Sequence, residues 1–220
     1  MVAGTKNFFQ FYHIIQLVFF LSFLCTEISI LFNENYNNLN LKGLIYLKQN
    51  KYDKSYSCLK KSLNKGDNFE GYLGLAEIYH QKDKFQKAIK YCKKALQFSN
   101  KDNKYACFLL ALLYYKMEDY NKAEEILLNL QVEFWLQAKV LLIKIYLENK
   151  KINKAKKVIN EMLNENEYKD IGKYFLAYYH FEQNNLEKAK KILNNLTISY
   201  DPENLKSKIN LSGAGRNKMR

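Results

Sequence analysis

The stretch DKFQKAIKYCKKAL, residues 83–96, decides how the rest of the chain is organised. Its apolar and small residues recur at steps of three and four, which places them on one face of a helix. These residues are Phe85, Ala88, Ile89, Cys92, Ala95 and Leu96. Ala88 and Ala95 are small, which suits a place where this face meets another helix closely. Because one helix cannot bury such a face alone, the pattern predicts further copies of the unit elsewhere in the chain.

The small residue of this stretch does recur, at a nearly fixed period. The equivalent positions are separated by 33, 35, 32 and 34 residues, and they hold Ser55, Ala88, Ala123, Ala155 and Ala189. A lysine directly precedes each of them: Lys54, Lys87, Lys122, Lys154 and Lys188. Two residues before each lysine stands a large apolar residue: Tyr52, Phe85, Tyr120, Ile152 and Leu186. A period of this length predicts a solenoid built from five stacked helical units.

The five units resemble tetratricopeptide repeats. The unit of that family has about 34 residues, with W-x2-L-G-x2-Y in its first helix and a small residue followed by an aromatic one in its second. The second unit matches with Tyr72, Leu75, Ala76, Tyr79, Phe85, Ala88 and Ala95. The other units keep this register, for example with Leu39, Gly43, Tyr46, Leu110, Ala111, Tyr114, Leu142, Tyr146, Leu176 and Ala177. Two features depart from the family: the first four units lack the closing proline, and the last two have Lys139 and Lys173 at the large first-helix position.

The resemblance implies an all-α fold: a right-handed superhelical solenoid of about five antiparallel helix pairs, here with an N-terminal hydrophobic helix. The repeat domain is expected over residues 36–200, with units at about 36–68, 69–103, 104–135, 136–169 and 170–200. A polar, asparagine-rich linker at 33–40 runs into the first repeat. Residues 201–220 are expected to form a short cap and a basic, flexible tail.

The composition fits a helical globular protein, with 48% apolar residues and a single proline among 220 residues. The net charge of +13 raises the alternative of a lysine-rich protein that binds RNA or another anionic surface. Only Arg216 and Arg220 are arginines, however, so 33 of the 35 basic residues are lysines, which lack the bidentate fork used at bases and phosphates. We therefore interpret most lysines as the solvated faces of helices.

Residues 8–32, FFQFYHIIQLVFFLSFLCTEISILF, differ from the rest of the chain in being predominantly apolar, although Gln10, Gln16 and Glu27 interrupt the run. Leu17 to Cys25 fits the core of a signal peptide, and a run extended to Phe32 fits a membrane anchor. Acylation at Cys25 and a helix packed on the first repeat are the remaining alternatives. We expect residues 1–32 to be a signal peptide or anchor, so that the protein is membrane-associated or exported, with its repeats on the non-cytoplasmic side.

The sequence carries no motif of a catalytic or metal site. It has no glycine-rich phosphate loop, no HExxH, no G-x-S-x-G and no CxxC pair, and its three histidines are far apart in sequence. We therefore expect no enzymatic activity, no cofactor and no metal. The expected function is to bind another protein. This expectation follows from the resemblance and not from a catalytic or ligand-binding motif.

In the resembled family, the concave groove is lined by first-helix residues that fall between the packing positions. Carried over to this chain, these partner-binding residues are Tyr105, Phe108, Leu112, Tyr115, Ile171, Tyr174, Tyr178 and Phe181. The clamp that some members use for a terminal carboxylate is absent, since those positions hold Asn40, Leu44, Gly74, Tyr105 and Leu109. The resemblance thus implies a protein or peptide partner with an apolar or amphipathic segment. The alternative is that the chain's own tail or N-terminal helix covers these rings.

Overall fold

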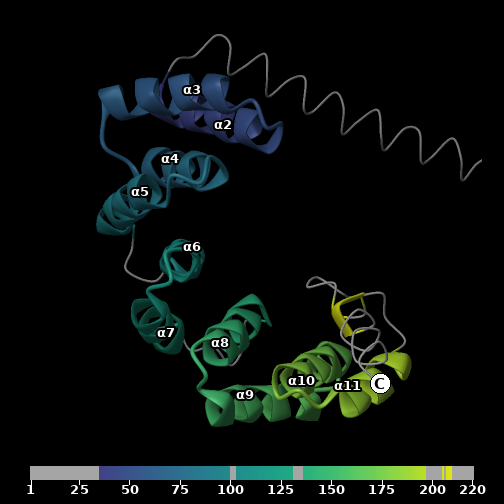
Figure 1. Cartoon of the computed structure of the whole chain (residues 1–220). Helices are drawn as coiled ribbons and strands as arrows, with labels where there is room; N and C mark the ends of the chain where they lie inside the picture. Colours follow the sequence, from purple (N-terminus) through teal and green to yellow (C-terminus); the bar gives the residue numbers. More distant parts are fainter. Residues whose placement is uncertain (1–34, 100–102, 131–135, 197–204, 206, 210–220) are drawn as a thin grey trace, which may run out of the picture. The chain divides into compact units, whose positions relative to one another are not determined.

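The computed structural model describes residues 35–99, 103–130, 136–196, 205 and 207–209, and all regular structure within them is helical (Figure 1). Ten helices lie in these ranges: α2 (Tyr36–Lys48), α3 (Tyr52–Lys65), α4 (Phe69–Gln81), α5 (Phe85–Phe98), α6 (Lys104–Lys116), α7 (Tyr120–Asn129), α8 (Leu136–Glu148), α9 (Ile152–Asn164), α10 (Lys169–Glu182) and α11 (Leu186–Asn194). The predicted all-α fold of helix pairs is confirmed. The predicted N-terminal hydrophobic segment at 1–32 and the tail from residue 210 lie outside the described residues.

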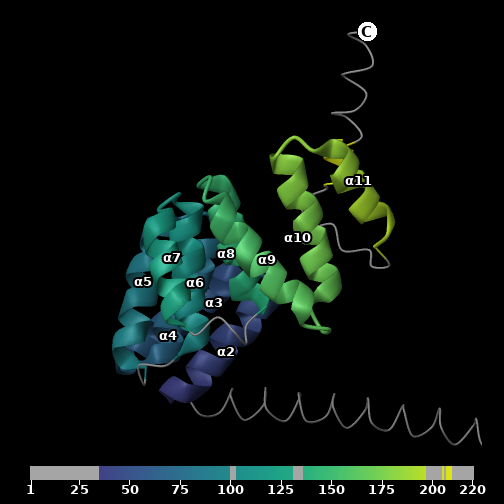
Figure 2. The ribbon, with the colours of Figure 1, turned by 90° about the horizontal axis from the view of Figure 1, so that it is seen from below.

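The chain divides into two compact units, Met1–Ala106 and Cys107–Arg220. In the first unit, α2 packs on α3 and α4 packs on α5. In the second unit, α8 packs on α9 and α10 packs on α11, and Figure 2 shows α10 and α11 as neighbouring antiparallel helices. In these four repeats the first helix therefore packs against the second.

The contact within each pair depends on the small residue that sets the repeat period. All five of these residues are fully buried: Ser55, Ala88, Ala123, Ala155 and Ala189. In the first repeat the two helices approach so closely that a Cβ atom added at Gly43 would lie 2.7 Å from the side chain of Leu59. Ser55 fits this contact because its Oγ donates a hydrogen bond of 2.7 Å to the carbonyl of Gly43. Its hydroxyl is thereby satisfied inside the core.

The core of the first unit combines aliphatic side chains with a stack of aromatic rings. Leu47, Leu59, Leu75 and Ile78 form a buried cluster. Beside them, the rings of Tyr79 and Tyr91 are parallel, with centroids 5.3 Å apart. Tyr72 continues this stacking to Tyr91 at 6.3 Å and to Phe98 at 5.6 Å. These ring pairs join α4 to α5 along most of their length.

Among its described residues, the second unit buries two charged side chains, and each of them is paired. Lys139 occupies the position where the family has a large first-helix residue, and it is only 3% exposed. Its Nζ lies 2.5 Å from a carboxylate oxygen of Glu165, so its methylenes fill the core while its charge is compensated. Glu124 on α7 accepts hydrogen bonds from Lys151 at 2.6 Å and Lys154 at 2.7 Å. Burial opposes the charged form of Glu124, but these lysines outweigh it and lower its pKa.

Every turn inside a repeat has the same backbone conformation, with one residue in the left-handed region. The φ angles there lie between 53° and 60°, at Asn50, Asp83, Glu118, Lys150 and Asn184. In the fourth repeat, Lys150 N–H donates to the carbonyl of Leu147, and the next N–H, of Lys151, donates to the carbonyl of Tyr146. These two bonds define the Schellman motif that ends a helix. Glycine is the usual residue at the left-handed position, yet this chain has none there.

We expect Lys150→Gly to stabilise the protein by about 0.5–1 kcal/mol, because the left-handed backbone conformation strains a lysine but not a glycine. Glycine also raises the conformational entropy of the unfolded chain, which offsets only part of this gain. Asp83→Gly is the matched control, since aspartate tolerates the left-handed region better than lysine does. The urea midpoint, followed by circular dichroism, measures both effects. Equal shifts for the two variants, or a lower midpoint for Lys150→Gly, would contradict this account of the turn.

Candidate partner-binding surface

The candidate surface lies on the first helices of the repeats in the second unit. Figure 1 shows α6, α8 and α10 following one another along one side of that unit, with α7 and α9 along the other side. Six of the eight predicted residues are partly buried and pack against the unit's main hydrophobic core: Phe108, Leu112, Tyr115, Ile171, Tyr178 and Phe181. The core thus holds one part of each side chain in place, while another part stays accessible to solvent.

Tyr174 does not belong to this surface, so the sequence-based expectation for it is wrong. Its side chain is 0% exposed, and its ring packs edge to face on Phe175, with centroids 5.3 Å apart. It shares a hydrophobic cluster with Leu205 and Ile209, which follow the last repeat and are themselves buried. The chain's own C-terminal segment therefore contributes to the core around the fifth repeat.

Tyr105 belongs to the first unit, whereas the other seven predicted residues belong to the second. It is 47% exposed, and its side chain is hydrogen-bonded to the carboxylate of Glu77 on α4. Burial raises the pKa of Glu77, while the bond from Tyr105 and the charge of Lys48 act in the opposite direction. Burial, and then the charge of Glu77, raise the pKa of Tyr105. Its hydroxyl is therefore a hydrogen-bond donor throughout the physiological pH range.

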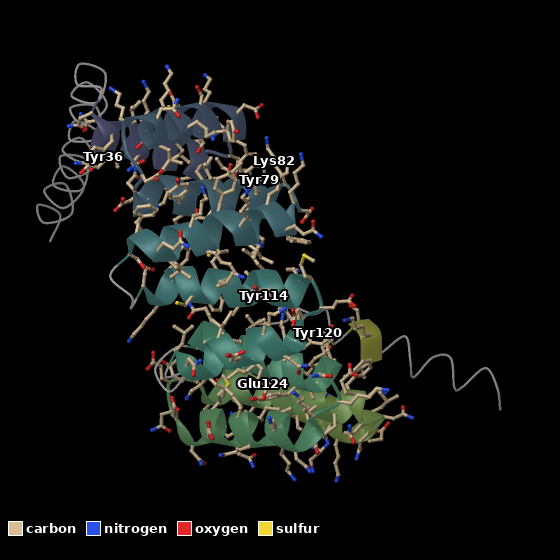
Figure 3. The ribbon with its side chains drawn as sticks, turned by 90° about the vertical axis from the view of Figure 1, so that its left-hand side faces the viewer. Tyr36, Tyr79, Lys82, Tyr114, Tyr120 and Glu124 are labelled. Atoms are coloured by element: carbon tan, nitrogen blue, oxygen red, sulfur yellow. The ribbon has the colours of Figure 1, made fainter. Side chains whose placement is uncertain are left out.

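A carboxylate fixes the orientation of Tyr115 at the C-terminal end of α6. The Tyr115 hydroxyl donates a hydrogen bond of 2.6 Å to Glu148 Oε1, at the last residue of α8. Tyr120, labelled in Figure 3, packs on Tyr115 with ring centroids 6.0 Å apart. Burial and a hydrogen bond to the same Glu148 raise the pKa of Tyr120. Two tyrosines thus share one carboxylate, which gives this part of the surface a polar edge.

A pair of stacked rings lies on α10. Tyr178 and Phe181 are separated by one helical turn, and their ring planes differ by 13° with centroids 6.5 Å apart. Both side chains are half-buried, so the pair is held rigidly while it keeps accessible area. Rigid aromatic rings give a binding surface large contact area at low entropic cost.

Within the described ranges, no three histidine, cysteine, aspartate or glutamate side chains gather where they could hold a metal ion. Cys92 is buried, with its Sγ 3.2 Å from the carbonyl oxygen of Ala106, which it reaches as a donor. A pocket of about 380 Å³ in the first unit is lined by Asn50, Lys51, Tyr52, Asp53, Lys54 and Lys82. Lys82 and Asp53 form an ion pair of 2.9 Å there, and none of the six lining residues is a serine, cysteine or histidine.

Models of the tetratricopeptide repeat match three segments of the sequence: residues 36–64, 69–102 and 105–130. The chain is a tetratricopeptide repeat protein. Repeats of this family bind protein or peptide partners, and proteins built from them are in general scaffolds without catalytic activity. A comparison with curated proteins found no match.

Solved structures of other tetratricopeptide repeat proteins share the fold. A tetratricopeptide repeat protein from Parabacteroides merdae is 19% identical, with a TM-score of 0.70, over 81% of this chain and 72% of the other. PilF of Pseudomonas aeruginosa is 17% identical, with a TM-score of 0.64, over 83% and 86%. YrrB, described as a tetratricopeptide repeat protein with an unusual peptide-binding site, is 17% identical, with a TM-score of 0.61, over 77% and 89%. At these identities the likeness concerns the fold.

The structure explains the lysine that precedes each small residue, a role that the sequence reading missed. In four of the five tetratricopeptide repeats this lysine lies over the tyrosine eight residues earlier, at 5.3–5.9 Å from the ring centroid. The pairs are Lys54 with Tyr46, Lys87 with Tyr79, Lys122 with Tyr114, and Lys154 with Tyr146. Each pair is a cation–π contact between the two helices of one repeat. The constant spacing of eight residues was the signal in the sequence.

The fifth repeat replaces this tyrosine with His180, opposite Lys188. Burial lowers the pKa of His180, and the positive charges of Lys188 and Lys156 lower it further. The folded protein therefore resists protonation of His180, whereas the unfolded chain takes up a proton near the ordinary pKa of about 6.5. Stability is consequently lost as the pH falls from that value towards the lower pKa of the folded state.

We expect His180→Tyr to remove this loss and to add the missing cation–π contact, so that stability rises by about 0.5–1 kcal/mol above pH 7 and by more below pH 6. His180→Gln is the control, because it removes the titrating group without supplying a ring. Urea midpoints measured between pH 5 and pH 8 separate the two contributions. If the difference in stability between the wild type and His180→Gln does not change with pH, His180 has the same pKa in the folded and unfolded states, and this explanation is wrong.

Proposed function

We propose that this protein is a non-enzymatic scaffold that holds an apolar or amphipathic segment of a partner protein against α6, α8 and α10. The observation that carries the proposal is the set of half-buried rings on α6 and α10, which have the core behind them and accessible area in front. Membership of the tetratricopeptide repeat family, whose repeats bind proteins and peptides, supports a protein segment as the ligand.

The chemistry of the surface indicates how such a segment would be held. Phe108, Tyr178 and Phe181 offer ring faces and edges between which an aliphatic or aromatic side chain of the partner fits. The Tyr115 and Glu148 pair offers a fixed polar edge, which suits a backbone N–H or a cationic group of the partner. Apolar burial would thus supply affinity, and the polar edge would set the direction of the segment.

Photo-crosslinking in the native cell tests this proposal. A photoreactive phenylalanine at Tyr178 is expected to capture one defined segment of another protein, identified by mass spectrometry, whereas the same group at Lys156 on α9 should not. Capture of residues from this chain's own C-terminal segment instead would show that the surface is filled internally and would contradict the proposal.

A synthetic peptide of the captured segment then allows a quantitative test. Phe181→Ala is expected to weaken its binding about tenfold, the loss typical of an aromatic anchor residue. Leu128→Ala is the matched control, because Leu128 is an exposed apolar side chain on α7, along the other side of the unit. Calorimetry on the full-length chain gives both affinities, and equal losses in the two variants would exclude the first-helix surface as the binding site.

We also propose that residues 8–32 attach the protein to a membrane or direct its export, which places the repeats on the non-cytoplasmic side. The support is the apolar run itself, with Lys6 before it and Glu27 and Glu34 late in it and after it. Within the described ranges, no helix has the length and apolarity needed to cross a bilayer. The apolar run lies outside those ranges.

Fractionation of native cells, followed by mass spectrometry of the mature N-terminus, tests this attachment. A start beyond about residue 25 is expected for a cleaved signal peptide, and an intact chain in the membrane fraction for an anchor. A lipid on Cys25 would give the same attachment by acylation. An intact chain that remains entirely in the soluble fraction would contradict the proposal.

A further inference from the structure

Three first helices pack on the second helix of the repeat before them: α4 on α3, α8 on α7 and α10 on α9. In α4, a Cβ atom added at Gly74 would lie 2.7 Å from the side chain of Leu59 on α3. Ile78, one turn further along α4, belongs to the same buried cluster as Leu59. Gly74 and Ile78 thus mark the face of a first helix that meets the preceding repeat.

The residues equivalent to Gly74 and Ile78 are buried in the later repeats, but they are accessible in the first. In the later repeats these pairs are Leu109 with Leu113, Leu141 with Ile145, and Phe175 with Tyr179. Tyr179 is partly exposed, and the others are at most 4% exposed. The equivalent residues of α2 are Leu41, which is 43% exposed, and Ile45, which is partly exposed. Among the described residues, no helix precedes α2 to cover this face.

The chain enters α2 in the same way as it enters α4 from α3. Asn35 caps α2 by accepting a hydrogen bond of 2.9 Å from the N–H of Asn38, and Asn68 caps α4 by accepting one of 2.7 Å from the N–H of Gly71. The two caps are 33 residues apart, which is the spacing of the first two repeats. In α4 this entry follows a second helix, α3, so the start of α2 has the local structure of a first helix that follows a second one.

The sequence before α2 matches the helix that would be expected there. Residues 19–32 lie 33 positions before α3, and several of their residues are identical or similar to those of α3. The matching pairs are Phe19 with Tyr52, Ser22 with Ser55, Phe23 with Tyr56, Cys25 with Cys58, Ser29 with Ser62, and Ile30 with Leu63. Ser22 therefore holds the small position that sets the repeat period, and its equivalent in α3 is fully buried.

We propose that residues 19–32 form the second helix of a further, N-terminal repeat and pack on α2. The contact of α3 with α4 is the template for this packing. On α3, Tyr56 packs edge to face on Tyr79 of α4, with ring centroids 6.4 Å apart. A Cβ atom added at Gly71 of α4 would lie 2.9 Å from the side chain of Leu63. Together with Leu59, these two residues form the side of α3 that faces the next repeat.

The equivalent side of residues 19–32 consists of Phe23, Thr26 and Ile30, and its sizes complement those of α2. Between α3 and α4, the large Leu59 lies against a glycine. At the equivalent place before α2 the sizes are exchanged, with the smaller Thr26 opposite Leu41. An exchange that keeps the total volume is the kind that packed cores tolerate best. Docking covers the accessible face of α2, as the end of a solenoid requires.

The opposite side of this helix specifies how the proposed membrane attachment takes place, and this step rests on that attachment. Six polar residues of α3 are exposed: Asp53, Lys54, Ser57, Lys61, Asn64 and Lys65. Their equivalents before α2 are all apolar: Phe20, Leu21, Leu24, Ile28, Leu31 and Phe32. A helix docked on α2 thus turns an apolar face outward, which suits the boundary between lipid headgroups and acyl chains. Residues 19–32 then lie along the bilayer while α2 holds them.

Disulfide cross-linking of the full-length chain in native membranes tests the docking. In a background with the four native cysteines replaced by alanine, the test variant carries Thr26→Cys and Leu41→Cys. The control carries Leu24→Cys and Leu41→Cys, because Leu24 is equivalent to the exposed Ser57 and lies on the outward side. We expect the test pair to form its disulfide at least about tenfold faster than the control, since only close Cα atoms can be bridged. Equal rates in the two variants overturn the docking.

Thiol accessibility gives a second measurement that needs one cysteine at a time. In the same background, Leu41→Cys is compared with Leu128→Cys, whose position is 55% exposed on α7. Docking is expected to slow the reaction of Cys at position 41 with a maleimide about tenfold relative to position 128, because the reaction requires access to the thiol. Both thiols should react alike in urea. Circular dichroism establishes that every variant is folded, and equal rates in the folded chains contradict the docking.

Fractionation of the same cells separates the docking from the membrane attachment. A cross-linked chain in the membrane fraction supports both, and a cross-linked chain in the soluble fraction supports the docking but contradicts the attachment. An intact chain that is membrane-bound without the cross-link supports the attachment and overturns the docking. A mature N-terminus beyond about residue 25 also overturns the docking, because cleavage removes half of the helix, whereas export is then supported.

Discussion

The close contact between the two helices of each repeat is the constraint on which the rest of the structure depends. It requires a side chain no larger than serine at one position of the second helix, and this position is fully buried in all five repeats. At Gly43 there is no room even for a Cβ beside Leu59. A larger group at either place would have to push the helices apart, at a cost of about 1–3 kcal/mol in a packed core. The repeat period is visible in the sequence because this contact recurs.

The same contact explains why helix pairs and turns could be predicted. The small residue, the large residue three positions before it and the polar turn before that are all local in sequence, so periodicity reveals them. The backbone of the turns was not predicted, because Glu118 and Lys150 are not residues that favour a left-handed conformation. There the Schellman hydrogen bonds and the packing of the two helices override the preference of the single residue.

The errors and omissions in the sequence-based prediction of the binding surface and of the buried ion pair have a different origin from those in the turns. Repeat register assigns Tyr174 to the same kind of position as Phe108, but it carries no information about segments outside the repeats. The buried Leu205 and Ile209 belong to such a segment, and they enter the core that contains Tyr174. The partner of Lys139 is Glu165, 26 residues later and beyond the end of α9. The two residues lie near opposite ends of the fourth repeat, so local periodicity does not reveal their ion pair. Contacts between residues so far apart in sequence are visible only in the folded structure.

A repeat with two helices lets two surfaces vary independently, because the contact between the helices constrains neither outer face. One lysine of each second helix is constrained, since it covers the tyrosine, or in the fifth repeat stands opposite the histidine, of the first helix. Lys94 of α5 is constrained as well, because it covers the ring of Tyr72 on α4 at 5.1 Å. The rings of α6 and α10 differ from these lysines, since the core supports them but does not cover them. Their accessible area is therefore better explained by a contact outside the repeat than by folding.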